Sequence, residues 1–137
     1  MRGLFYFTLI IFFALSASCR KQKSPIYKTS DLYGTWLRSS SSRPMYDSMV
    51  VEINETTDGG IIRSTPNGYF IVGEKKWTNI TPDDDSSFVY EELGSNKVYY
   101  SARMVYIKNS PDSIERLYLE INSNGEDNGS YQYWEKR

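Results

Sequence analysis

Short segments in which apolar and polar residues alternate run through most of this chain, separated by clusters of turn-forming residues. Residues 49–54 show this pattern, and residues 114–121 repeat it near the end of the chain. A period of two residues is typical of strands with one buried face. No stretch after residue 30 keeps a helical period over three turns. The pattern therefore predicts an all-β fold.

About eight such segments follow one another, and we expect each of them to form a strand. They are residues 34–37, 49–54, 61–64, 69–73 (continued or restarted at 75–80), 87–93, 97–108, 114–121 and 130–136. Most connections are rich in Gly, Asn, Asp and Pro, and the serine-rich residues 39–44 are expected to be a flexible loop. Consecutive strands joined by short turns form an antiparallel up-and-down meander, and closure removes its exposed edges. We expect one closed barrel over residues 31–137.

The first 18 residues have a different character. Arg2 carries a positive charge, residues 4–15 are apolar, and residues 16–18 are small. The apolar run is shorter than the roughly 20 residues that span a bilayer, and this order is typical of a secretory signal. We expect residues 1–18 to be removed, so that Cys19 becomes the first residue. The polar and basic residues 19–30 are then a flexible tether.

Residues 15–19, Leu-Ser-Ala-Ser-Cys, resemble the lipobox of bacterial lipoproteins, with the aliphatic residue one place earlier than usual. The resemblance implies that Cys19 receives a lipid and that the protein contacts a membrane through it. The alternative is a secreted protein with one free thiol, which is less favoured because such a thiol is exposed to oxidation. Some Bacteroidetes lipoproteins carry acidic residues just after this cysteine, which send them to the cell surface. Residues 20–23, Arg-Lys-Gln-Lys, lack such acids, so the resemblance implies a cell-envelope lipoprotein at the outer membrane, facing the periplasm.

The composition excludes several kinds of chemistry. The chain has no histidine, which removes imidazole bases, histidine-dependent nucleophiles and imidazole metal sites. Its net charge of −1 is too small and too evenly spread to favour nucleic acid as a partner. We expect no catalysis, no cofactor and no metal. A hydrolase or isomerase that uses carboxylates or tyrosines is the least favoured alternative.

Several polar groups are candidates for a metal, catalytic or modification site. The acidic residues 83–85 and the turn at 122–128 lack the ligand spacing of a calcium loop, so solvated turns are expected. Glu91 and Glu92 are adjacent on a strand, point to opposite faces, and are expected to be exposed surface charges. Ser48 and Ser113 each stand in an Asp-Ser-aliphatic triplet, which resembles the O-glycosylation sites of exported Bacteroidetes proteins.

Gly34 and Trp36 form a Gly-x-Trp triplet at the start of the first expected strand, which resembles the signature of the lipocalins in the calycin group. The glycine allows a tight turn, and the tryptophan places a large apolar plate across one barrel end. The resemblance implies that a basic residue of the last strand packs on this ring, either Arg137 or Lys136. The second lipocalin signature is absent. Residues 31–137 are thus similar to the small lipocalin-like lipoproteins of Bacteroidetes.

Aromatic residues are abundant, at 21 of 137, and most of them follow residue 18. We expect seven of them to line a pocket: Phe70, Phe88, Tyr90, Tyr100, Tyr106, Tyr131 and Tyr133. The alternative is that they are ordinary core and cross-strand pairs. The expected function is an envelope-tethered, non-catalytic module for a small apolar or amphipathic ligand. The alternative is a packed barrel that contacts or inhibits another envelope protein. The volume of the interior cavity distinguishes the two functions, since about 300 Å³ or more favours a ligand and a filled interior favours a protein partner.

Overall fold

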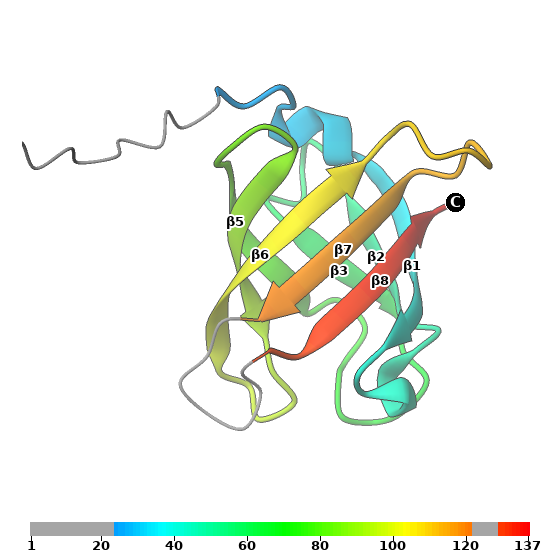
Figure 1. Cartoon of the computed structure of the whole chain (residues 1–137). Helices are drawn as coiled ribbons and strands as arrows, with labels where there is room; N and C mark the ends of the chain where they lie inside the picture. Colours follow the sequence, from blue (N-terminus) through cyan, green and yellow to red (C-terminus); the bar gives the residue numbers. More distant parts are fainter. Residues whose placement is uncertain (1–23, 122–128) are drawn as a thin grey trace, which may run out of the picture.

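The computed structural model describes residues 24–121 and 129–137, and these form a closed barrel of eight antiparallel strands in chain order (Figure 1). The strands are β1 (Gly34–Ser41), β2 (Val50–Ile53), β3 (Gly60–Ser64), β4 (Lys75–Pro82), β5 (Ser87–Leu93), β6 (Tyr99–Ile107), β7 (Arg116–Ile121) and β8 (Tyr131–Lys136). The short 3₁₀ helix η1 (Thr29–Leu32) precedes β1, and η2 (Pro44–Tyr46) connects β1 to β2. The expected up-and-down closed barrel is confirmed, and it is compatible with a lipocalin-like fold.

Two expected segments differ from the structure. β1 continues through residues 39–41, where a flexible loop was expected, because β8 lies beside it and supplies backbone partners: Ser40 pairs with Tyr133 and Ser41 with Gln132. Residues 69–73, expected to be a strand, belong instead to the connection between β3 and β4. The expected signal peptide, Cys19 and the turn at 122–128 lie outside the described residues. No helix of the described part is long and apolar enough to cross a membrane.

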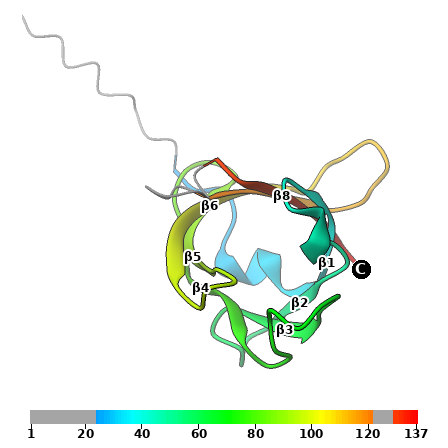
Figure 2. The ribbon, with the colours of Figure 1, turned by 90° about the horizontal axis from the view of Figure 1, so that it is seen from below.

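Helix η1 closes one end of the barrel, which we call the sealed end. Seen along the barrel axis in Figure 2, η1 lies across the far side of the ring of strands. Leu32 and Trp36 are fully buried there, and the Trp36 indole N–H donates a hydrogen bond to the Leu32 carbonyl at 2.8 Å. The Tyr106 ring meets Trp36 edge to face at 6.2 Å and Tyr27 at 4.8 Å. Aromatic packing therefore seals this end.

Below η1 the interior is filled by apolar side chains from every strand. Trp77 and Trp134 meet edge to face at 4.8 Å near the centre. Around them pack Val51, Ile62, Phe88, Met104, Leu117 and Leu119, all fully buried. Gly60 makes this packing possible, because a Cβ atom at that position would stand 2.6 Å from the Trp77 ring and 2.7 Å from Val51. The barrel is thus a packed core over most of its length.

The opposite end, which we call the open end, carries the β1–β2, β3–β4 and β5–β6 connections. Side-chain contacts join these connections to one another. The Asn67 amide donates to the Met45 carbonyl at 2.7 Å, which links the β3–β4 connection to η2. Lys97 forms an ion pair with Glu74 at 2.8 Å, which links the β5–β6 and β3–β4 connections. These contacts hold the open end in one arrangement.

Candidate binding site at the open end

Four buried polar side chains lie in the barrel toward the open end. They are Arg38 from β1, Lys76 from β4, Glu92 from β5 and Gln132 from β8, and none is more than 3% exposed. We call them the inner polar cluster. Strand alternation places most of them: Arg38 follows Trp36 by two residues, and Gln132 precedes Trp134 by two.

Glu92 is the hub of this cluster. Its carboxylate lies 2.8 Å from the Lys76 ammonium and accepts a hydrogen bond from the Tyr90 hydroxyl at 2.6 Å. It also accepts one from the Gln132 amide, whose oxygen in turn accepts from the Trp134 indole at 2.9 Å. A buried charge is tolerated only when it is paired and hydrogen-bonded, and both carboxylate oxygens of Glu92 meet this condition.

The pKa values of the cluster reflect both burial and pairing. Burial disfavours the Glu92 carboxylate, but Lys76 and the surrounding donors outweigh it, so the pKa of Glu92 lies below its ordinary value. Burial lowers the pKa of Lys76, with Glu92 opposing that effect. Burial and the neighbouring Glu92 charge raise the pKa of Tyr90 well above its ordinary value. Tyr90 therefore remains a hydrogen-bond donor at any physiological pH.

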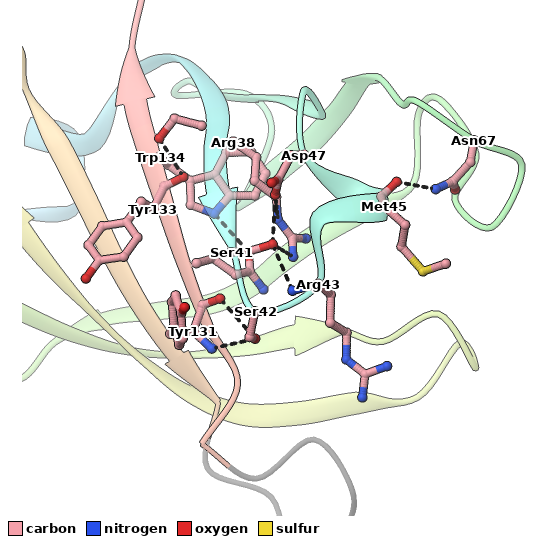
Figure 3. A network of polar contacts seen from close by, with 12 residues as sticks. Arg38, Ser41, Ser42, Arg43, Met45, Asp47, Asn67, Tyr131, Tyr133 and Trp134 are labelled. Carbon is pink, nitrogen blue, oxygen red and sulfur yellow. Dashed lines mark hydrogen bonds and ion pairs between the residues drawn. The ribbon is translucent and has the colours of Figure 1, made fainter.

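Arg38 is the member of the cluster with donors left over. One terminal nitrogen donates to the Ser41 hydroxyl at 2.8 Å, and Ser41 donates to Asp47 at 2.7 Å (Figure 3). The Arg38 Nε atom lies 3.4 Å from the Asp47 carboxylate, yet it is buried and makes no hydrogen bond. Burial lowers the pKa of Arg38, against the opposing effects of Glu92 and Asp47.

A cavity opens beside this cluster at the open end of the barrel. Its charged lining comprises Arg38, Arg43, Lys76 and Glu92. The free volume is about 40 Å³, and since one water needs about 10–15 Å³, it holds roughly three water-sized groups. Pockets for drug-sized ligands take about 300 Å³ or more. This cavity therefore has room for a small polar group and not for a large apolar ligand.

The seven aromatic residues expected to line one pocket fall into three places. Those that line this cavity are Phe70, Tyr100 and Tyr131. Those that are buried elsewhere in the barrel are Phe88, Tyr90 and Tyr106. Tyr133 lies on the outer face, 40% exposed, with its ring 5.0 Å from that of Tyr118. The aromatic residues thus contribute to the core, to the cavity and to the outer surface.

The residues of the Gly-x-Trp triplet lie together at the sealed end. Gly34 has a φ of +141°, which favours glycine, and a Cβ atom there would stand 2.7 Å from the Lys136 side chain. The Lys136 ammonium lies 5.5 Å from the centre of the Trp36 ring. Between the two alternatives for the basic residue on this ring, Lys136 occupies the position, while the Arg137 backbone N–H donates to Thr35 at 2.9 Å.

The expectation that Glu92 is an exposed charge is wrong, since only 1% of it is exposed. Glu91 does face outward, where it accepts a hydrogen bond from Asn79, so the two carboxylates point to opposite faces as expected. Glu92 is stable inside because Lys76 is buried next to it. One signal was available in the sequence: Glu92 shares its face with Phe88 and Tyr90, at spacings of two residues.

The remaining sequence candidates lie in loops. Ser48 and Ser113 are exposed, with φ values of +73° and +61°. Residues 83–85 form the turn between β4 and β5. Among the described residues, no three His, Cys, Asp or Glu side chains are grouped as metal ligands.

Fold and cavity together define the class: a closed eight-stranded barrel with one sealed end and a small, largely cationic cavity at the other. No protein-family model, no curated protein and no solved structure matches this chain. Its function must therefore be argued from its own residues.

Replacing Tyr90 with phenylalanine tests the cluster. We expect Tyr90→Phe to lower the free energy of unfolding by about 1.5–3 kcal/mol, because the buried Glu92 carboxylate loses a donor. Urea unfolding followed by tryptophan fluorescence measures the change. Tyr133→Phe, on the outer face, is the matched control, with an expected change within about 0.5 kcal/mol. Equal effects of the two variants would contradict the role of Tyr90.

Proposed function

We propose that this protein is a non-catalytic binding module of the bacterial cell envelope, held at a membrane through a lipid on Cys19, which contacts another envelope protein through its open end. The filled barrel interior is the observation that carries this proposal. A carrier of apolar ligands needs a hollow interior, whereas the cavity here measures about 40 Å³. This supports the packed barrel that acts on a protein partner over the small-ligand module.

The surface of the open end supports a protein partner. Its connections expose several large apolar side chains, among them Met45, Tyr69, Ile71, Val72 and Val98. Ile71 and Val72 are 61% and 58% exposed at neighbouring positions. Clustered apolar groups on a soluble domain are typical of interaction sites. Because side-chain contacts already order these connections, little conformational entropy is lost on binding.

The place where the N-terminal tether joins the barrel also supports a partner at the open end. The first described residues reach the barrel at the sealed end, where the Ile26 N–H donates to the Asp85 carbonyl at 2.8 Å. A lipid on Cys19 would therefore attach the barrel to the membrane by its sealed end. The open end then faces away from that membrane, toward other envelope proteins.

The chemistry of the site supports binding without catalysis. Glu92, the carboxylate in the cavity lining, already accepts hydrogen bonds from Tyr90 and Gln132 and pairs with Lys76. These three contacts and its lowered pKa make Glu92 a weak base. We assign the chain to the lipocalin-like lipoproteins of the calycin group as part of the proposal, supported by Gly34 and Trp36 at the sealed end.

Position-specific cross-linking tests this proposal. A photo-reactive amino acid at Val72 of the full-length chain, expressed in its own host, should form a discrete protein adduct. The same amino acid at Val89, which is 43% exposed on the barrel wall, should not. Ile71→Asp should reduce the adduct about tenfold, because a charge in an apolar interface costs more than 1.4 kcal/mol.

Two outcomes would contradict the proposal. Equal adducts from positions 72 and 89 would mean that the open end has no special role. A small molecule that stays bound in native mass spectrometry, with no protein adduct at position 72, would favour the ligand-binding alternative.

A further inference from the structure

Among the buried charges at the cavity, Arg38 alone has unused hydrogen-bonding capacity within the described residues. The Lys76 ammonium donates to the Leu93 carbonyl and pairs with Glu92, and it lies 4.3 Å from the centre of the Phe70 ring. Arg38 donates one hydrogen bond, to Ser41, although a guanidinium carries five N–H groups. Its Nε atom forms an ion pair with Asp47 at 3.4 Å, and its Cζ atom lies 5.6 Å from the centre of the Tyr46 ring, so donors on its terminal nitrogens remain. A buried donor without a partner is unfavourable, so a ligand that accepts from Arg38 would gain affinity.

The cavity also selects for charge and size. Arg38 and Lys76 are the buried cations of its described lining, and the carboxylate there, that of Glu92, is already paired with Lys76, so the remaining N–H donors belong to Arg38. An anion is therefore favoured over a cation. Room for about three water-sized groups matches a carboxylate, which has three non-hydrogen atoms.

We propose that the cavity at the open end binds a carboxylate group on the Arg38 guanidinium, and that a peptide segment of the partner protein supplies this carboxylate. The second half of this inference rests on the proposed function, whereas the first half rests on the cavity alone. Arginine suits the role because its planar fork matches the two oxygens of a carboxylate. The apolar side chains of the open end would then contact the residues next to that carboxylate.

Asp47 limits the affinity of the cavity for a carboxylate. Its carboxylate lies 3.4 Å from Arg38 Nε, so it competes for the charge that an incoming carboxylate needs. Ser41 holds both groups, as it accepts from Arg38 and donates to Asp47. This competition predicts a gain of affinity when Asp47 loses its charge, and a purely structural role of Arg38 would not produce such a gain.

The experiment is a titration of the detergent-solubilised full chain, labelled with ¹⁵N at arginine and followed by NMR at the side-chain Nε–H signals. The probes are sodium acetate, the tripeptide acetyl-Ala-Ala-Ala with a free carboxylate, and the same tripeptide as its amide. Sodium chloride at equal ionic strength is the control. We expect the Arg38 signal to shift saturably with acetate and the free tripeptide, and not with the amide or with chloride.

Two variants make the result specific. Arg38→Gln should weaken tripeptide binding about tenfold or more, as expected for the loss of charge-assisted hydrogen bonds. Because Arg38→Gln removes a buried side chain and can impair folding, Asp47→Asn provides a second test in a variant that keeps the Ser41 contact. It should tighten tripeptide binding about threefold to tenfold.

The outcomes separate the two halves of the inference. The carboxylate site is overturned if acetate and the tripeptide shift the Arg38 Nε–H signal no further than chloride does. This holds even if cross-linking at Val72 succeeds. Acetate and tripeptide binding with equal affinity overturns the peptide as the source and leaves a site for small carboxylates. Binding of the tripeptide at least tenfold more tightly than acetate supports the carboxylate site and a peptide as its ligand. With a discrete adduct at position 72 it supports both halves, and without that adduct the partner protein as the source is overturned.

Discussion

Glu92→Gln is expected to lower the free energy of unfolding by about 3–5 kcal/mol, the usual cost of removing one partner of a buried ion pair. The Lys76 ammonium lies 2.8 Å from the carboxylate, and both side chains are almost completely buried. Without Glu92 the ammonium stays in the barrel with no counter-charge. Chemical denaturation of the purified protein, with fluorescence and circular dichroism as two probes, measures the loss.

Two controls isolate the ion pair. Glu91→Gln changes the neighbouring carboxylate on the outer face and should cost no more than about 0.5 kcal/mol. Lys76→Met combined with Glu92→Gln removes both charges and should be more stable than Glu92→Gln alone, since a buried pair can be replaced by neutral groups at little cost. Equal losses for the Glu91 and Glu92 variants would contradict the buried pair.

The pH dependence gives an independent check on Glu92. Its pKa in the folded protein is lowered, chiefly because Lys76 outweighs the effect of burial. The unfolded chain therefore binds more protons once the pH falls below about 4.3, the ordinary value for Glu. The stabilisation is present above that pH and is lost as the pH falls through the lowered pKa. In the Glu92→Gln variant, the free energy of unfolding should therefore fall less steeply with decreasing pH than it does in the Glu91→Gln variant.

Trp36→Ala is the second change with a large expected effect, a loss of about 3–5 kcal/mol in the free energy of unfolding. Trp36 is fully buried against Tyr106, and its indole N–H holds the Leu32 carbonyl of η1. Removing the ring leaves a cavity and releases η1 from the sealed end. Denaturant unfolding measures the total loss, and amide hydrogen exchange should show faster exchange over residues 29–33.

Trp36→Phe is the matched control, because it keeps an aromatic ring and removes the N–H donor. We expect it to cost about 1–3 kcal/mol, less than the alanine variant. If the free energy of unfolding of Trp36→Ala lies within about 1 kcal/mol of that of the unmodified protein, the sealed end does not depend on this tryptophan. Such a result would also weaken the assignment to the lipocalin-like lipoproteins.

The strand pattern was predictable because alternation and turn residues are local signals. Residues 87–93 coincide with β5 as expected, and the other confirmed strands differ by a few residues at their ends. The two misassigned segments have non-local causes. Ser39 to Ser41 extend β1 because β8 pairs with them from the other end of the chain. Residues 69–73 are apolar, but they lie at the open end, outside the ladder.

The candidate site was only partly accessible to sequence reasoning. Phe70, Tyr100 and Tyr131 were expected near a pocket and line the cavity. Its central residues, Arg38 and Lys76, were not expected inside the barrel. Lys76 could not have been placed by alternation, because Lys76 and Trp77 are consecutive and both buried, next to a shift of register between β3 and β4.

The sequence by itself determined most of the strands, their meander order and the place of Gly34 and Trp36 at the start of β1, because alternation and turn residues are local signals. Tertiary structure alone decided which charges could be buried. Glu92 on β5 and Gln132 on β8 stand 40 residues apart in the chain, and the closed barrel brings the Gln132 amide to the Glu92 carboxylate. Lys76 reaches the same carboxylate from the neighbouring strand β4. A charged side chain is stable in a core only when it is paired and hydrogen-bonded, and the packing of several strands around one interior supplies those partners.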